Sequence, residues 1–117
     1  MAEPGSGGET AELRRLRRRI DALDRRIVRL LNERAELARD VGRAKERTGR
    51  PAVHDPERER EVLLRVSMAN TGPTPQADLL ALYRRLFAVA RSLERQDRTR
   101  VVRAAKLGLV PEPGDDR

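Results

Sequence analysis

Residues 13–45 read LRRLRRRIDALDRRIVRLLNERAELARDVGRAK, and this stretch decides the fold. Apolar residues recur along it in alternating steps of three and four, the spacing of one continuous face of an α-helix. The positions are Leu13, Leu16, Ile20, Leu23, Ile27, Leu30, Leu37, Val41 and Ala44. The place due between Leu30 and Leu37 is held by a cation, Arg34. The pattern predicts one long helix with an apolar seam that contains a single charge.

The length of this helix bears on how its seam is covered. No Pro or Gly interrupts the stretch before Gly42, so about 33 residues rising about 1.5 Å each give a rod on the order of 50 Å long. A compact chain of this size has a radius of gyration of about 13 Å. The rod is too long to be covered by its own chain, and we expect a second subunit to complete the seam.

Composition favours an all-α protein. The 117 residues leave room for one domain, and Tyr83 and Phe87 are the only aromatic residues. Leu, Ala, Arg, Glu and Val dominate, which favours helix. Without cysteine, neither a disulfide framework nor a thiolate zinc site can form. The first residues lack the basic and apolar regions of a signal peptide, and no apolar run reaches the roughly 18 residues of a membrane span. We expect a soluble cytoplasmic protein.

The net charge of +7, from 26 basic and 19 acidic residues, is compatible with anionic partners. Nucleic acid is one candidate. Acidic residues are, however, interleaved with the arginines, two aromatics offer little base stacking, and no zinc-finger or RNP-like motif is present. These features argue against binding to nucleic acid, and solvated helix surfaces explain most of the arginines.

Two further helices are expected, with flexible ends around them. Residues 1–10 predict a disordered tail, and Thr10 is placed to cap the long helix, which ends near Arg47. A second helix begins after Asp55-Pro56 and ends before the breaker cluster at 70–75. A third begins near Gln76, so that the helical domain covers residues 11–105 and a flexible tail covers 106–117.

Arg34 is the sharpest local signal, because a charge in an apolar seam needs a partner or a ligand. An acidic residue that pairs with it and sets the register is one explanation. A ligand is the other: Lys45 lies eleven residues on, within about 20° of the same helix face, so the two cations could hold a small anion between them. Arg17 shares that face but lies about 25 Å away along the axis. It could join the others only from a second, antiparallel chain, and on periodicity alone it is an exposed arginine.

The second and third helices carry the remaining candidates. Asp55 is explained by its place as a helix cap, while Glu59 lies one turn before Val62 and Leu63 and tends toward the buried side, with Arg58 beside it. On the third helix Glu94 follows Ala90 by one turn on an otherwise apolar stripe. Burial there should raise the pKa of its carboxyl group unless a cation lies near. No metal-ligand spacing is present, and His54 beside the cap is expected at the surface.

The stretch LRRRIDALDRRIVRLLNERAELARDVGRAK, followed by RP, DPERE and a third helix, resembles the all-helical class of chorismate mutase over roughly residues 13–97. The motifs that carry the resemblance are the L-R-x-x-I-D-x-L-D start, the V-G-x-x-K end and the D-x-x-R-E entry to the second helix. The resemblance implies an intertwined homodimer of three-helix chains that converts chorismate, a dianion, to prephenate in aromatic amino acid biosynthesis. It implies no cofactor and no metal.

The resemblance also assigns roles, position by position. Arg17 matches the arginine that reaches into the partner's site to hold one substrate carboxylate, and Arg34 the arginine that holds the other. Lys45 matches the lysine that donates to the ether oxygen and a carboxylate. Asp55 and Glu59 match the acids near the substrate hydroxyl, and Arg58 the arginine that supports the pocket.

The third helix departs from the family, which commonly has a Ser and, four residues later, a Gln that donates to the ether oxygen. Ser92 and Gln96 have this spacing but lie about 160–200° from the apolar face. We therefore assign the two positions to Ala90 and Glu94. A glutamate can donate only when protonated, which predicts activity that falls as Glu94 ionises. Ala90 leaves open a mutase of 4-amino-4-deoxychorismate or an isochorismate pyruvate lyase, and a non-enzymatic basic helical dimer that binds nucleic acid is the alternative of another class.

Overall fold

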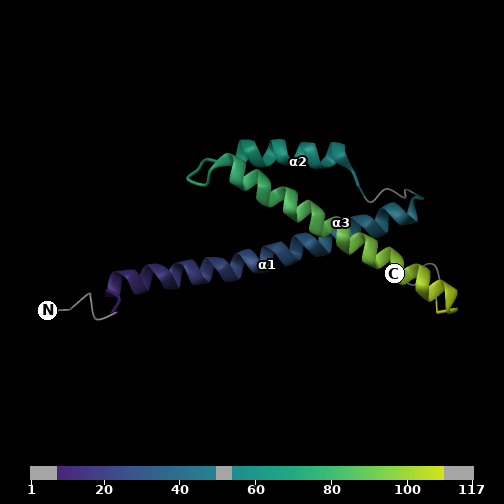
Figure 1. Ribbon diagram of the computed structural model, residues 1–117, viewed down its shortest axis with the longest axis horizontal. Coiled ribbons are helices and arrows are strands. Elements are labelled where there is room, and N and C mark those ends of the chain that lie inside the picture. Colours follow the sequence, from purple (N-terminus) through teal and green to yellow (C-terminus); the bar gives the residue numbers. More distant parts are fainter. Residues whose placement is uncertain (1–7, 50–53, 110–117) are drawn as a thin grey trace. The chain divides into compact units, whose positions relative to one another are not determined.

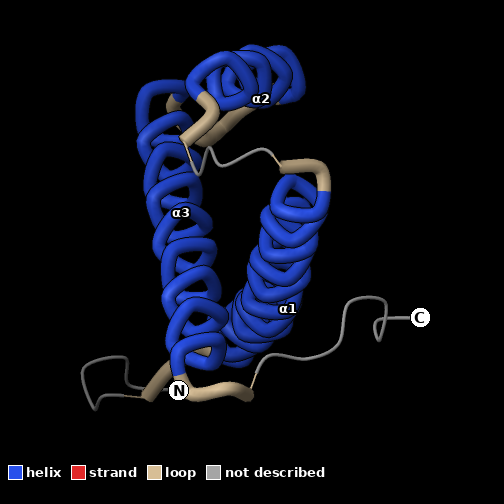
Figure 2. The backbone as a smooth tube through the Cα atoms, turned by 90° about the vertical axis from the view of Figure 1, so that its right-hand side faces the viewer, coloured by secondary structure: helices blue, strands red, loops and turns tan. Residues whose placement is uncertain are grey.

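The computed structural model describes residues 8–49 and 54–109, and the regular structure in these ranges is entirely α-helical. The helices are α1 (Ala11–Arg47), α2 (Pro56–Ala69) and α3 (Gln76–Lys106) (Figure 1). Figure 2 colours helices and loops separately, and no strand occurs in the described parts of the chain. The all-α class, the three helices and the very long first helix are thereby confirmed. The predicted N-terminal tail falls largely outside the described residues, as do Arg50, Pro51 and residues 110–117.

The chain divides into two compact units, the first ending at Arg34 and the second beginning at Ala35, so that α1 contributes to both. In the first unit Thr10 caps α1 as predicted, because its Oγ1 accepts a hydrogen bond from the backbone N–H of Leu13 at 3.1 Å. Glu9 forms an ion pair with Arg17. The apolar seam of this unit is exposed within the single chain: Ile20 is 55% exposed and Leu30 is 58% exposed.

In the second unit α2 and α3 form a helical hairpin and pack against each other (Figure 1). Asp55 caps α2 as predicted, since its Oδ1 accepts a hydrogen bond from the backbone N–H of Arg58 at 3.1 Å, and Pro56 is the first helical residue. At the turn, Asn70 donates to the carbonyl oxygen of Thr74 at 3.1 Å and accepts from the N–H of Gly72 at 3.0 Å. Gly72 has φ of 82°, a conformation that glycine adopts without strain.

The core of the second unit is small. Phe87 is the only apolar side chain in residues 8–49 and 54–109 that is buried, and Tyr83 meets its ring edge to face with centroids 6.3 Å apart. The last turns of α1 meet α3 through polar groups, among them Arg39 and Asp97. Polar contacts between α1 and α3 therefore join these two helices beside a small apolar core.

Candidate active site

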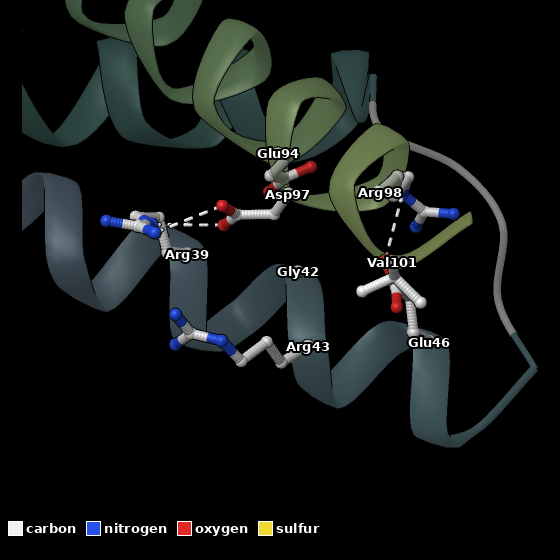
Figure 3. Close-up of a pocket in the computed structure, with 8 residues that line it drawn as sticks. All are labelled: Arg39, Gly42, Arg43, Glu46, Glu94, Asp97, Arg98 and Val101. Atoms are coloured by element: carbon white, nitrogen blue, oxygen red, sulfur yellow. Dashed lines mark hydrogen bonds and ion pairs between the residues drawn. The ribbon is translucent and has the colours of Figure 1, made fainter. Parts of the chain in front are cut away.

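Glu94 is the one charged side chain in the described ranges that is buried, with 7% of its surface exposed. It projects from α3 onto the backbone of α1 at Gly42, which is also buried (Figure 3). A Cβ atom added at Gly42 would lie 2.9 Å from Cγ and 3.2 Å from Cδ of Glu94. Glycine inside a helix is less favourable than alanine by about 1 kcal/mol. The close approach of Glu94 explains why a glycine is needed here.

Two ion pairs between α1 and α3 flank this contact. Arg39 holds Asp97 through two hydrogen bonds, Nε to Oδ2 and Nη2 to Oδ1, both at 3.0 Å. On the other side Arg98 Nε lies 3.5 Å from Glu46 Oε1. Figure 3 shows the two pairs on either side of Gly42. They fix the position of α3 along α1 and so fix where Glu94 meets that helix.

A cavity of about 110 Å³ opens beside the contact, lined by Arg39, Gly42, Arg43, Glu46, Glu94, Asp97, Arg98 and Val101. Within the described part of the chain, Oε2 of Glu94 is buried and has no hydrogen-bond partner. A buried carboxylate oxygen without a donor is costly. The carboxyl group is therefore suited to being protonated, or to accepting a hydrogen bond from a ligand.

Burial raises the pKa of Glu94, and the opposing attraction of Lys45 and Arg98 does not cancel this effect. The pKa increase expected from the apolar stripe is thereby confirmed. Asp97 shows the opposite behaviour, because its hydrogen bonds from Arg39 lower its pKa. Two carboxyl groups three residues apart on one helix thus differ in proton affinity, a pattern that is frequent at functional sites.

Lys45 is half-buried and lies near enough to Glu94 to affect its pKa through charge. This electrostatic attraction between a cation of α1 and the carboxyl group lies within the second unit. Arg34, at the end of the first unit, is half-buried, which suits a charge placed in an apolar seam. Arg17 has a side chain that is 63% exposed and pairs with Glu9. Its assignment to a partner's site stays a prediction.

The candidates on α2 lie around its first turn. Glu59 is half-buried and forms an ion pair with Arg91 of α3, and His54 Nε2 lies 3.7 Å from its other carboxylate oxygen. Arg58 is exposed and pairs with Glu61. Asp55 caps the helix, so its structural explanation is confirmed, while its proposed role near a substrate hydroxyl is untested.

On α3 Glu94 is buried and Gln96 is exposed, as expected from helix rotation, whereas Ala90 and Ser92 are both half-buried and so are not separated by burial. Ser92 and Gln96 line a different groove, formed by α3 alone together with Arg95, Thr99, Arg100 and Arg103. Which two positions of α3 contact a substrate stays a prediction.

Four residues around Glu94 were not predicted from the sequence: Arg39, Gly42, Asp97 and Arg98. A signal for three of them was present. Asp97 and Arg98 follow Glu94 by three and four residues and so share its face. Gly42 is a glycine within a helical pattern, which often marks a close approach. Nothing in the sequence indicated that Arg39 would form an ion pair with Asp97, because this contact depends on how α1 and α3 cross.

Residues 8–49 and 54–109 contain no group of three or more His, Asp or Glu side chains arranged to hold a metal ion. No helix within the same ranges is both long enough and apolar enough to cross a lipid bilayer.

Comparison with known proteins supports a single family. Residues 16–95 match the family model for chorismate mutase type II. A bifunctional chorismate mutase/prephenate dehydratase of Aquifex aeolicus is 42% identical over 89 residues, which are 73% of this chain and 24% of that protein. A chorismate mutase of Methanocaldococcus jannaschii is 40% identical over 55 residues, 47% of this chain and 54% of that protein. The chain thus spans about a quarter of the length of the bifunctional relative.

A solved structure shows the same fold. The structure of chorismate mutase (Form II) from Thermus thermophilus superposes with a TM-score of 0.68 and 34% sequence identity. The superposition covers 72% of this chain and 94% of that one.

Proposed function

Because the chain belongs to the chorismate mutase type II family, we propose that it converts chorismate to prephenate. The observation that carries the proposal is the match of residues 16–95 to the family model, which includes most of α1, all of α2, the first part of α3 and every candidate site residue. The buried carboxyl group of Glu94 near Lys45 adds support from the described geometry.

The reaction is an intramolecular rearrangement in which the ether C–O bond breaks as a C–C bond forms. No proton is gained or lost, so the protein needs neither a nucleophile nor a cofactor. Its task is to hold a flexible dianion in the reactive conformer, and to place positive charge or hydrogen-bond donors where the ether oxygen becomes negative. Arginines suit the first task, because their planar guanidinium groups bind carboxylates with two hydrogen bonds.

The proposed roles follow this division. Arg34 binds one substrate carboxylate and Arg17, from a second copy of the chain, binds the other. Lys45 donates to the ether oxygen and to a carboxylate. Asp55 and Glu59 lie near the substrate hydroxyl, Arg58 supports the pocket, and Ala90 lines it without a hydrogen bond.

Glu94 completes the site as a neutral donor to the ether oxygen. A carboxyl group can donate only in its protonated form. The increase in its pKa by burial, which Lys45 only partly opposes, favours that form. Activity should therefore be highest at mildly acidic pH.

The proposed dimer accounts for the exposed seam of α1. Seven leucine and isoleucine residues of the seam, from Leu13 to Leu37, are each at least 39% exposed in the single chain. Full burial of such a side chain is worth roughly 1.5–3 kcal/mol. A second copy of α1 presents the same seam, so a symmetric interface would cover both at once.

A direct assay tests the function. Chorismate is added to the purified protein, its ultraviolet absorbance is followed, and the product is identified by mass spectrometry and by acid conversion of prephenate to phenylpyruvate. Formation of prephenate supports the proposal. Release of pyruvate from isochorismate, or turnover of 4-amino-4-deoxychorismate alone, would assign a related activity that Ala90 leaves open. No turnover of any of these, together with binding to nucleic acid, would favour the non-enzymatic alternative.

A further inference from the structure

Glu94 is held against α1 by a contact that leaves no room for a side chain. The ideal Cβ position at Gly42 lies 2.9 Å from Cγ, 3.2 Å from Cδ and 3.4 Å from Oε1 of Glu94. Atoms at the first of these distances cannot coexist, so one of the two residues must move if a side chain is added. Glu94 is the one that can move, because its side chain rotates about three bonds whereas Gly42 lies in the backbone of a helix.

The surroundings decide where the carboxyl group would go. Beside it lies the cavity of about 110 Å³, which is lined by both residues and borders solvent-exposed groups such as Arg43 and Val101. A displaced carboxyl group would turn into this space, where water can reach it. The ion pairs of Arg39 with Asp97 and of Arg98 with Glu46 would keep α3 in register meanwhile.

We propose that Gly42 is a positioning residue for Glu94: the absence of a side chain at Gly42 makes the space in which the Glu94 carboxyl group is held, buried, against α1. The catalytic consequence rests on the proposed function, because it requires Glu94 to donate a hydrogen bond to substrate. The statement that Gly42 makes space for the Glu94 carboxyl group does not depend on the proposed function.

The charged groups around Glu94 come from both helices. Lys45 and Arg98 attract the charged form, whereas Asp97 and Glu46 disfavour it, and burial outweighs each of these effects. Burial makes the largest contribution to the raised pKa of Glu94, and moving the carboxyl group toward water removes it. Gly42→Ala should therefore lower the pKa of Glu94 toward that of an exposed glutamate.

The experiment measures this pKa in the free protein. Protein labelled with ¹³C at glutamate carboxyl groups is titrated by NMR, and the Glu94 signal is identified by its absence in Glu94→Gln. In Gly42→Ala the Glu94 titration should shift to lower pH, and kcat/KM at pH 7 should fall by about tenfold or more, since one hydrogen-bond donor to a developing oxyanion contributes on the order of 10²–10³-fold. An unchanged Glu94 titration in a folded Gly42→Ala protein would overturn the proposal.

If Gly42→Ala does not fold by itself, the same substitution made in Glu94→Ala protein keeps the test decisive. Glu94→Ala removes the atoms that the new methyl group would meet, so Gly42→Ala should be tolerated in Glu94→Ala protein. If the double variant folds and Gly42→Ala by itself does not, the steric contact between Gly42 and Glu94 is supported. If neither the double variant nor Gly42→Ala folds, the contact is refuted. If the wild-type protein turns over no chorismate, the proposed function fails, yet the titration still decides the role of Gly42.

Discussion

Arg39 of α1 donates two hydrogen bonds to Asp97 of α3, from Nε to Oδ2 and from Nη2 to Oδ1, each at 3.0 Å. The pair lies one turn beyond Glu94 and joins the two helices whose crossing buries that residue. Phe87 is the only buried apolar side chain among the described residues of this unit, so we expect the pair to contribute to its stability.

Loss of this pair should lower stability in a pH-dependent way. The hydrogen bonds from Arg39 lower the pKa of Asp97. Their stabilisation is therefore complete above the ordinary pKa of an aspartate, about 4, and is lost as the pH falls through the lowered native value. Urea unfolding should show Asp97→Asn to be less stable than wild type at pH 7, with the difference shrinking in acid.

Arg39→Ala serves as the partner variant for this prediction. If the two residues act through each other, the double variant should be little less stable than either single one. Additive losses in the double variant would show that the two side chains act independently.

Activity should depend on the protonation of Glu94. Burial raises the pKa of this carboxyl group, and only its protonated form can donate to an ether oxygen. Above that pKa, kcat/KM should fall by up to about tenfold per pH unit. In Glu94→Gln the donor does not titrate, so the profile should flatten; a descending limb that persists in this variant would exclude Glu94 as its source.

Lys45 and Arg34, the two cations of α1 placed in the proposed site, should be essential for turnover. Lys45→Ala and Arg34→Ala should each reduce kcat/KM by about 10²-fold or more, the usual effect of removing one donor to a developing oxyanion. Arg25→Ala removes a cation from the exposed surface of the same helix and should keep near-normal activity. Steady-state assays, with circular dichroism to check folding, compare the three. Near-normal rates in Lys45→Ala would contradict the proposed site.

Mixing of inactive variants tests whether Arg17 acts across subunits. Arg17→Ala and Lys45→Ala should each be inactive alone. If Arg17 serves the partner's site, a heterodimer of the two has one site with both changes and one with neither. After unfolding and refolding an equal mixture, about one quarter of wild-type activity should return.

The oligomeric state gives the control for this experiment. Light scattering should show dimers for the wild type, for both variants and for the mixture. Absence of any recovery in a sample that is fully dimeric would place Arg17 and Lys45 in the same subunit's site, whereas activity in Arg17→Ala alone would place Arg17 outside the site.

Much of the fold could be predicted from local patterns. Thr10 and Asp55 cap their helices as expected, and α1 runs to Arg47 before Gly49 adopts φ of 76°. These features depend on residues within one turn of each other, so a short stretch of sequence contains their causes. Burial of Glu94 followed in the same way from its place on an apolar stripe.

The sequence by itself thus determined the three helices, their ends, the exposed seam and the buried acid of α3. The tertiary structure alone decided what that acid meets: Gly42 opposite Glu94, and Arg39 opposite Asp97. Helical spacing says which residues share a face, but it does not say which residue of another helix lies across from them. That register depends on where α1 and α3 cross, which is set by the packing of residues more than fifty positions apart in the chain.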